Sequence, residues 1–309
     1  MARRWTETDV PDLHGRIAVI TGGNTGLGFE TARVLATRGA TVVLACRDQT
    51  RATSAAARLP GHAETLHLDL SDPLSVRRAG TELRERHPRV DLLINNAGAL
   101  QPRHALTPDG WELTLATNHL GPFAFTGLIL DTLLPVAGSR IVTVSSIGHR
   151  YGSGVINFDD LHAGPPRAAY FQSKLANLMF TYELQRRLTA AGAPTIAVAA
   201  HPGNARTEFG RALPRVQQAL MSPRLSFLTW WLMQSPAVGA LATLRAATDP
   251  ATSGGDFYGP PGRRQFTGHP ELIEPSPEAR SAPAQQRLWQ ESQRLTGITY
   301  PLPQPASAP

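Results

Sequence analysis

Lys174 is the only lysine in this 309-residue chain, and it follows Tyr170 by four positions. If residues 167–190 form a helix, the two side chains share one face, and the ammonium lies within electrostatic reach of the phenol. A nearby cation favours the phenolate and lowers a tyrosine pKa that is ordinarily about 10. The pair is therefore a candidate acid/base centre. The structural alternative is a lysine on a solvated helix face beside an ordinary half-buried tyrosine.

A glycine-rich turn near the amino terminus could hold a second component of a reaction. It follows an apolar run over 16–20, typical of a buried strand, and opens a helical pattern that closes at Gly39. Glycines let the backbone approach a pyrophosphate closely, and a helix N-terminus supplies free N–H groups. This order predicts a dinucleotide site, with tight-turn packing as the alternative. The expected contacts are Thr21, Gly22, Asn24, Thr25, Gly26, Leu27 and Gly28.

The T-G-x-x-x-G-x-G spacing of this turn resembles the short-chain dehydrogenase/reductase family. Four further motifs follow in family order: Asn95-Asn96-Ala97-Gly98, Ser145-Ser146, the Y-x-x-x-K pattern from Tyr170 to Lys174, and His201-Pro202-Gly203. The likeness runs from about Asp12 to Tyr300. The segment Asn118-His119-Leu120-Gly121 is among those that are most similar to the retinol-dehydrogenase-like branch. The resemblance implies an oxidoreductase that acts on alcohols and carbonyl compounds.

Strand and helix patterns alternate from residue 16 to residue 200 without a linker, which favours one α/β domain over two. We expect a single doubly wound parallel sheet, a Rossmann fold, over residues 12–300, with helices on both faces and a final strand at 256–258. Residues 205–235 would form a small helical substrate lid. Residues 1–11 and 301–309 are expected to be flexible tails.

Tyr170 is the expected acid/base, because a phenol can donate a proton to a carbonyl oxygen and accept one in the reverse direction. By the resemblance, Lys174 would lower the pKa of Tyr170 and hold the nicotinamide ribose. Ser146 would hydrogen-bond the substrate oxygen and stabilise its developing charge. Ser145 is the weaker candidate, since family members use the second position of this pair.

Asn118 lies in the helical stretch 111–134 and resembles the family asparagine that holds a water in the proton relay. The alternative is a polar residue inside a helix, bonded to neighbouring backbone beside a break at Pro122. His119 and His149 flank the expected site, but position alone assigns them no function.

Further cofactor contacts are implied by the resemblance alone. Asp69 and Leu70 would meet the adenine, although Asp69 could instead cap the following helix, a role for which Asp72 competes. The adenine-ribose side would be lined by Asn95, Ala97 and Gly98. The nicotinamide end would be met by Pro202, Gly203 and Thr207, although Asn204-Ala205-Arg206 departs from the common family pattern.

Arg47 indicates which nicotinamide cofactor the protein uses. Family members that prefer NAD usually carry an acidic residue just after the second strand, which is expected at 41–45. Here Cys46 and Arg47 occupy that place, and an arginine can bind a 2′-phosphate through two N–H groups. Asp48 could serve the ribose instead, but it fits better as a helix cap. NADP(H) is therefore expected, with NAD(H) as the alternative.

The segment 211–234 contains two tryptophans among many apolar residues, which suggests a lipophilic substrate. Core packing, an oligomer contact or a membrane-surface contact are the alternatives. A homo-oligomer is plausible from the family alone.

Composition excludes other classes of function. The ten histidines show no metal-ligand spacing, so no metal is expected. The net charge of +6 comes from scattered arginines without aromatic interleaving, so no nucleic acid is expected. No apolar run approaches the roughly 20 residues of a membrane span, and the single cysteine suits the cytoplasm. The rival to an enzyme is a regulator that senses NADP without turnover.

Overall fold

A central eight-stranded sheet organises the protein, whose computed structural model describes residues 4–205, 233–262 and 264–302. The strand order is β3-β2-β1-β4-β5-β6-β7-β8, and every neighbouring pair is parallel except β7 with β8. The strands are β1 (Ile17–Thr21), β2 (Thr41–Cys46), β3 (Ala63–His67), β4 (Leu92–Asn95), β5 (Arg140–Val144), β6 (Ile196–Ala200), β7 (Phe257–Gly259) and β8 (Glu271–Leu272).

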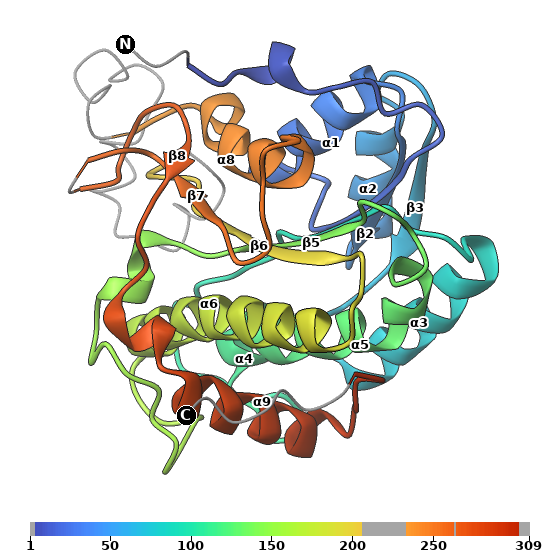
Figure 1. Cartoon of the computed structure of the whole chain (residues 1–309). Helices are drawn as coiled ribbons and strands as arrows, with labels where there is room; N and C mark the ends of the chain where they lie inside the picture. Colours follow the sequence, from blue (N-terminus) through green and yellow to red (C-terminus); the bar gives the residue numbers. More distant parts are fainter. Residues whose placement is uncertain (1–3, 206–232, 263, 303–309) are drawn as a thin grey trace.

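Helices cover both faces of this sheet (Figure 1). One face carries α1 (Gly26–Thr37), α2 (Gln49–Ala56) and α8 (Pro236–Thr248). The other carries α3 (Pro73–Arg86), α5 (Gly121–Leu133) and α6 (Pro166–Ala190), with α9 (Ala282–Thr296) outside α6 as a further layer. Short helical turns are η1 (Glu7–Asp9), α4 (Leu113–Leu115), η3 (Ile147–Arg150) and η6 (Pro277–Arg280). The doubly wound fold is thereby confirmed.

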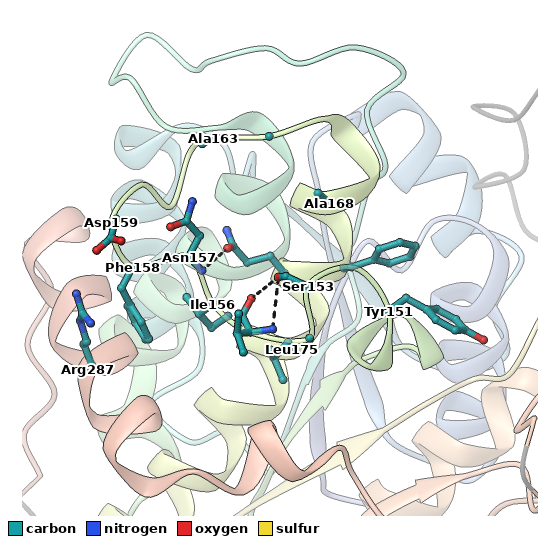
Figure 2. Close-up of a pocket in the computed structure, with 15 residues that line it drawn as sticks. Tyr151, Ser153, Ile156, Asn157, Phe158, Asp159, Ala163, Ala168, Leu175 and Arg287 are labelled. Carbon is teal, nitrogen blue, oxygen red and sulfur yellow. Dashed lines mark hydrogen bonds between the residues drawn. The ribbon is translucent and has the colours of Figure 1, made fainter.

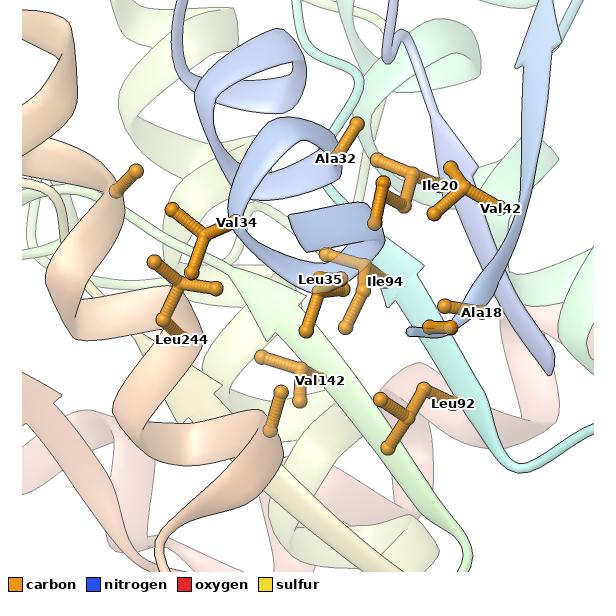
Figure 3. Close-up of a cluster of buried hydrophobic side chains, with 14 of the residues drawn as sticks. Ala18, Ile20, Ala32, Val34, Leu35, Val42, Leu92, Ile94, Val142 and Leu244 are labelled. Atoms are coloured by element: carbon orange, nitrogen blue, oxygen red, sulfur yellow. The ribbon is translucent and has the colours of Figure 1, made fainter. Parts of the chain in front are cut away.

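Alternation along the strands builds the two halves of the core. Ala18 and Ile20 of β1 face α1 and α8, whereas Val19 faces the layer that contains α3 and α5. Between the sheet and the first layer, Leu35 of α1 packs in one cluster with Val142 of β5, and Leu244 of α8 lies beside Val34 of α1 (Figure 3). Because both faces are covered, the strands are apolar runs rather than alternating ones.

The strand order brings the sequence motifs together. The chain winds outward from β1 through β2 to β3 and then returns to place β4 on the other side of β1. The carboxyl ends of β1, β4, β5 and β6 therefore lie side by side, and each is followed by one of the motifs. Ligands of open α/β sheets bind at such a reversal of strand order.

Three expectations about elements need correction. The sheet does not end at the strand expected over 256–258, because β8 pairs with β7 in the antiparallel direction at the edge. Residues 1–11 are not a loose tail throughout, since Trp5 and Val10 are buried in the core. The expected helix over 111–134 is interrupted, although not by an end at Pro122.

That interruption is a π-helical segment, Ala116–Leu120, which leads directly into α5. Pro122 has no N–H group, so it cannot pair with the carbonyl of Asn118 in the ordinary α register. The wider π register shifts each donor by one residue and lets the helix continue. The Gly121 N–H accordingly bonds the carbonyl of Ala116. The proline widens the helix at Asn118 instead of ending it.

The start of α5 leaves no room for a side chain at Gly121. A Cβ atom there would lie 2.1 Å from the Leu70 carbonyl oxygen, which is backbone and cannot swing away. We expect Gly121→Ala to lower the free energy of unfolding by about 1–3 kcal/mol or more through overpacking. Urea denaturation measures the change. Gly138→Ala, which meets open space at φ 74°, should cost only about 1–2 kcal/mol from backbone conformation. Equal stability of the Gly121→Ala variant and the native protein would contradict the assignment.

Candidate active site

The glycine-rich turn after β1 has the geometry of an anion cradle. Gly22 and Gly26 adopt positive φ angles of 63° and 56°, which side-chain-bearing residues rarely reach. Thr25 stands at the N-cap of α1 without a side-chain capping bond, so its side chain does not occupy the first-turn N–H groups of the helix. Free N–H groups and the helix dipole suit a pyrophosphate there. The chain thus fits a dinucleotide at Thr21–Gly28.

Asn96 braces this turn, a function that the sequence reasoning missed. Its Nδ2 donates to the Thr21 carbonyl at 2.9 Å and to the Gly22 carbonyl at 3.3 Å. The backbone N–H groups of Asn96 and Ala97 both donate to Thr21 Oγ1, at 3.1 and 3.0 Å. A Cβ on Gly28 would lie 2.5 Å from Asn96 Nδ2. Thr21 and Gly28 therefore shape the turn, and the doubled asparagine at the end of β4 is the sequence feature that could have indicated this contact.

Asn95 and Gly98 have separate environments. The buried Asn95 side chain donates to Thr126 Oγ1 of α5 at 3.0 Å, so its amide nitrogen joins β4 to that helix. Gly98 lies between two site residues, because a Cβ there would be 3.1 Å from Lys174 Nζ and 3.6 Å from Asn118 Oδ1. A glycine at this position leaves room for the lysine and asparagine side chains.

The two serines after β5 have different partners. Ser145 Oγ is buried and donates to the Lys174 carbonyl oxygen at 2.7 Å, which fastens α6 to the strand end. Ser146 is partly exposed, begins η3 by accepting from the Gly148 N–H at 3.1 Å, and hydrogen-bonds the Tyr170 side chain. Of the pair, Ser146 is the one that faces the phenol.

Lys174 is held in the protein interior, with only 5% of its surface exposed. Its Nζ donates to the Val144 carbonyl oxygen at 3.1 Å and lies 5.8 Å from the centre of the Tyr170 ring. Burial penalises the ammonium and lowers the pKa of Lys174 to about 8. The reading of this lysine as part of a solvated helix face is therefore wrong.

The expected lowering of the Tyr170 pKa is not found. Part of the residue is accessible, but protein surrounds the hydroxyl, and this burial raises the pKa of Tyr170 to about 12. The hydrogen bond with Ser146 acts in the opposite direction, and Lys174 makes no resolved contribution. Desolvation outweighs the nearby cation, so the phenol keeps its proton at neutral pH.

Asn118 is fully buried in the π segment and bridges three groups. Its Oδ1 accepts from the Ala99 N–H at 2.7 Å, and its Nδ2 donates to the Ala99 carbonyl and to Ser173 Oγ, both at 2.9 Å. Ser173 in turn donates to the Tyr170 carbonyl at 2.7 Å. The side chain thus links the loop after β4 to the helix that carries Tyr170 and Lys174.

The residues after β2 separate into a cap and an exposed cation. Asp48 Oδ1 accepts from the Arg51 N–H at 3.0 Å and caps α2, as the sequence indicated. Arg47 is exposed at the carboxyl end of β2. Cys46 is buried against the glycine-rich turn, and this burial raises the pKa of its thiol to about 11. Arg47 is thus the basic side chain available to a phosphate at this strand end.

The structure assigns the cap of α3 to Asp72, which accepts from the Leu74 N–H at 2.9 Å. Asp69 is not the cap; its Oδ1 accepts from the N–H and Oγ of Ser71. The Leu70 side chain is buried in the core. The adenine contact of Asp69 and Leu70 stays a prediction.

The segment after β6 turns sharply at Gly203, whose φ is 65°. A Cβ there would lie 2.5 Å from the Phe266 carbonyl oxygen. Gln234 Nε2 donates to the Pro202 carbonyl at 2.7 Å and fixes the preceding residue. Thr207 and most of the expected lid over 205–235 lie outside the described residues.

A cavity of about 530 Å³ lies beside this site (Figure 2). Its lining comes from the excursion over 151–164, from Ala168, Phe171, Gln172 and Leu175 of α6, and from Arg287 of α9. Ala168, Gln172 and Leu175 point away from the face that holds Tyr170 and Lys174, whereas the Phe171 ring lies 6.0 Å from the Tyr170 ring. The cavity is therefore on the outer side of the catalytic helix.

Comparisons with known proteins agree with this arrangement. The short chain dehydrogenase family matches residues 16–217. Retinol dehydrogenase 13 of Homo sapiens is 40% identical over 300 residues, which cover 94% of this chain and 87% of that protein. A crystal structure of an uncharacterized protein from Mycobacterium paratuberculosis is 42% identical, with a TM-score of 0.81, and covers 97% of this chain and 100% of that one. The Pseudomonas aeruginosa RhlG/NADP active-site complex has a TM-score of 0.65 at 25% identity, over 80% and 94% of the two chains.

The chain belongs to the short-chain dehydrogenase family, and it is similar to retinol dehydrogenases over most of its length. It is thus an oxidoreductase that takes a small-molecule substrate. Among the described residues, no helix is long and apolar enough to cross a membrane.

The single lysine makes the electrostatics of the site directly measurable. In protein labelled with ¹³C-lysine, one side-chain signal should titrate near pH 8 instead of 10.5. Because folding lowers this pKa, the cost of burying the ammonium is full below about pH 8. That cost fades as the pH rises toward 10.5, so this group makes the protein more stable over that window. A signal that titrates above pH 10 would show a solvated lysine and refute the burial.

Proposed function

We propose that this protein transfers a hydride between NADP(H) and the alcohol or carbonyl group of a lipophilic small molecule, with Tyr170 as the acid/base. The observation that carries the proposal is the meeting of the Tyr170 phenol with Ser146, one helical turn from the buried Lys174. All three lie at the sheet edge that also holds the glycine-rich turn.

At neutral pH the protonation states supply the proton that reduction of a carbonyl group needs. With a pKa near 12, Tyr170 is a phenol and can give its proton to a carbonyl oxygen as the bound nicotinamide supplies the hydride. Ser146 donates to the same oxygen or to the phenolate that forms, and so stabilises developing negative charge. Lys174 is charged below about pH 8 and stabilises that charge from the next helical turn.

Asn118 is a positioning residue in this scheme, since its polar atoms already bond Ala99 and Ser173. A relay water would bind near its Oδ1, which lies beside Gly98, as does Lys174 Nζ. The arrangement supports a path for protons from solvent to Tyr170.

Arg47 supports NADP(H) over NAD(H). The acidic Asp48 is engaged as the cap of α2, whereas Arg47 is exposed and can meet a 2′-phosphate. A protein of the same fold binds NADP in the Pseudomonas aeruginosa RhlG/NADP active-site complex. A lipophilic substrate is supported by the similarity to retinol dehydrogenases and by the apolar composition of residues 211–234.

A regulator that senses NADP without turnover is the alternative. It would need the glycine-rich turn but no proton donor. The contact of Ser146 with Tyr170 and the burial of Lys174 disfavour it.

Removal of the Tyr170 hydroxyl tests the enzyme directly. NADPH consumption should be visible with aliphatic, aromatic, terpenoid or steroid carbonyl compounds and should fall about 100-fold or more in Tyr170→Phe. For the native protein, the rate should also decline as the pH rises through about 8, because Lys174 loses its charge. Tyr182→Phe, a tyrosine on the same helix outside the site, is the control. Tight NADPH binding without turnover across the panel would instead support the sensor.

Arg47→Asp tests the cofactor preference. Loss of a charge-assisted pair, and repulsion of the phosphate by the new carboxylate, should lower the NADPH to NADH affinity ratio by about 10-fold or more. Titration of each cofactor by fluorescence gives the two dissociation constants, with Arg51→Asp on α2 as the matched control. An unchanged affinity ratio would show that a group other than Arg47 distinguishes NADPH from NADH.

A further inference from the structure

The residue after Asn118 connects the π segment to the C-terminal helix. His119 is 2% exposed, and its Nε2 lies 2.8 Å from Ser292 Oγ of α9, 173 positions away in the chain. Ser292 is 1% exposed. Asn118 and His119 project from adjacent positions of the π segment in different directions. Asn118 is fixed by Ala99 and Ser173 on one side, and His119 is fixed by α9 on the other.

Buried polar side chains lie between this histidine and Lys174. Asn177, one turn beyond Lys174 on α6, lies near enough to the His119 ring to affect its pKa, and it donates from Nδ2 to the Val144 carbonyl at 3.2 Å. Lys174 Nζ donates to that same oxygen at 3.1 Å. Burial lowers the pKa of His119 to about 4, so the ring is neutral and has one donor and one acceptor nitrogen. The hydrogen bonds from α9 end at His119, whose Nδ1 has no partner among the described residues, but the buried polar side chains of His119, Asn177 and Lys174 follow one another up to the Val144 carbonyl.

The C-terminal segment holds α5 firmly enough to transmit this contact. Tyr300 Oη donates to the Phe123 carbonyl at 2.6 Å. Gly127 of α5 is closely covered, since a Cβ there would lie 2.7 Å from Ile298 and 2.8 Å from Tyr300. A π turn lacks the close packing of an α turn, so an outside anchor has more influence on its geometry.

From this connection we infer that Ser292 and His119 are positioning residues for the proton-transfer groups. Helix α9 acts on the reaction by fixing the π segment that carries Asn118, and thereby the surroundings of Lys174. The inference rests on the proposed function for its effect on rate. Its effect on Lys174 is independent of turnover. Loss of the Ser292 hydroxyl leaves the buried His119 nitrogen without a partner, loosens the π segment and admits water toward the ammonium.

The test compares Ser292→Ala with Thr296→Val, which removes the other hydroxyl of the same buried helix face. Thr296 Oγ1 donates to the Ser292 carbonyl within α9, accepts from the Ile298 N–H at 3.3 Å, and makes no bond to the π segment. The Lys174 signal of ¹³C-lysine-labelled protein should titrate at least about half a pH unit higher in Ser292→Ala, and kcat should fall about ten-fold. KM for NADPH and the unfolding midpoint should match those of Thr296→Val.

His119 provides a second pair of variants. His119→Phe keeps the ring but removes both nitrogens, and it should repeat the Ser292→Ala effects. His119→Gln restores a polar atom near the place of Nε2 and should recover most of kcat.

The outcomes separate this inference from the proposed function. An identical Lys174 titration and kcat in Ser292→Ala and Thr296→Val would overturn the positioning function, even where native protein turns over and Tyr170→Phe does not. A failure of the native protein to turn over would refute the proposed function. The Lys174 titration would then still decide whether the contact of α9 with His119 affects the pKa of Lys174.

Discussion

The ammonium of Lys174 lies in the protein interior, and a buried charge costs several kcal/mol unless its surroundings are built for it. Much of the carboxyl edge of the sheet serves this requirement. Val144 at the end of β5 accepts the ammonium hydrogen, and Ser145 fastens the lysine backbone to the same strand end. Gly98 leaves the space that the Nζ atom needs. Strand β5, the loop after β4 and helix α6 are thereby held in one arrangement.

The two titratable groups of the site are shifted by the same cause in opposite directions. Burial disfavours charge, so the pKa of Lys174 falls to about 8 while that of Tyr170 rises to about 12. Each group therefore lies closer to its neutral form than it would in water. Ser146 is the group that acts against burial at the phenol. A site of this kind holds its proton donor ready and develops charge only during the reaction, when preorganised dipoles are most effective.

The outer layer of the protein also belongs to this arrangement. Because Pro122 has no N–H group to donate to the carbonyl of Asn118, the helix widens to the π register there instead of ending. A widened turn needs support from outside, which α9 gives through Ser292 and the segment after α9 gives through the Tyr300 hydroxyl bond to Phe123. Helix α6 thus has the sheet on one side and the C-terminal helix, about 100 residues later in the chain, on the other.

The sequence by itself determined the strand and helix order, the glycine-rich turn and the pairing of Tyr170 with Lys174, because these depend on local patterns and on spacing along one helix. It also separated Ser146 from Ser145 by resemblance. What only the tertiary structure decided was where each polar side chain finds its partner: Asn96 on the turn, His119 on α9. The tertiary structure also decided the direction in which the pKa of Tyr170 shifts. The spacing along the helix shows a nearby cation, but burial depends on every element that packs around the phenol. Local spacing specifies which groups can meet, whereas desolvation and long-range hydrogen bonds exist only once the chain is folded.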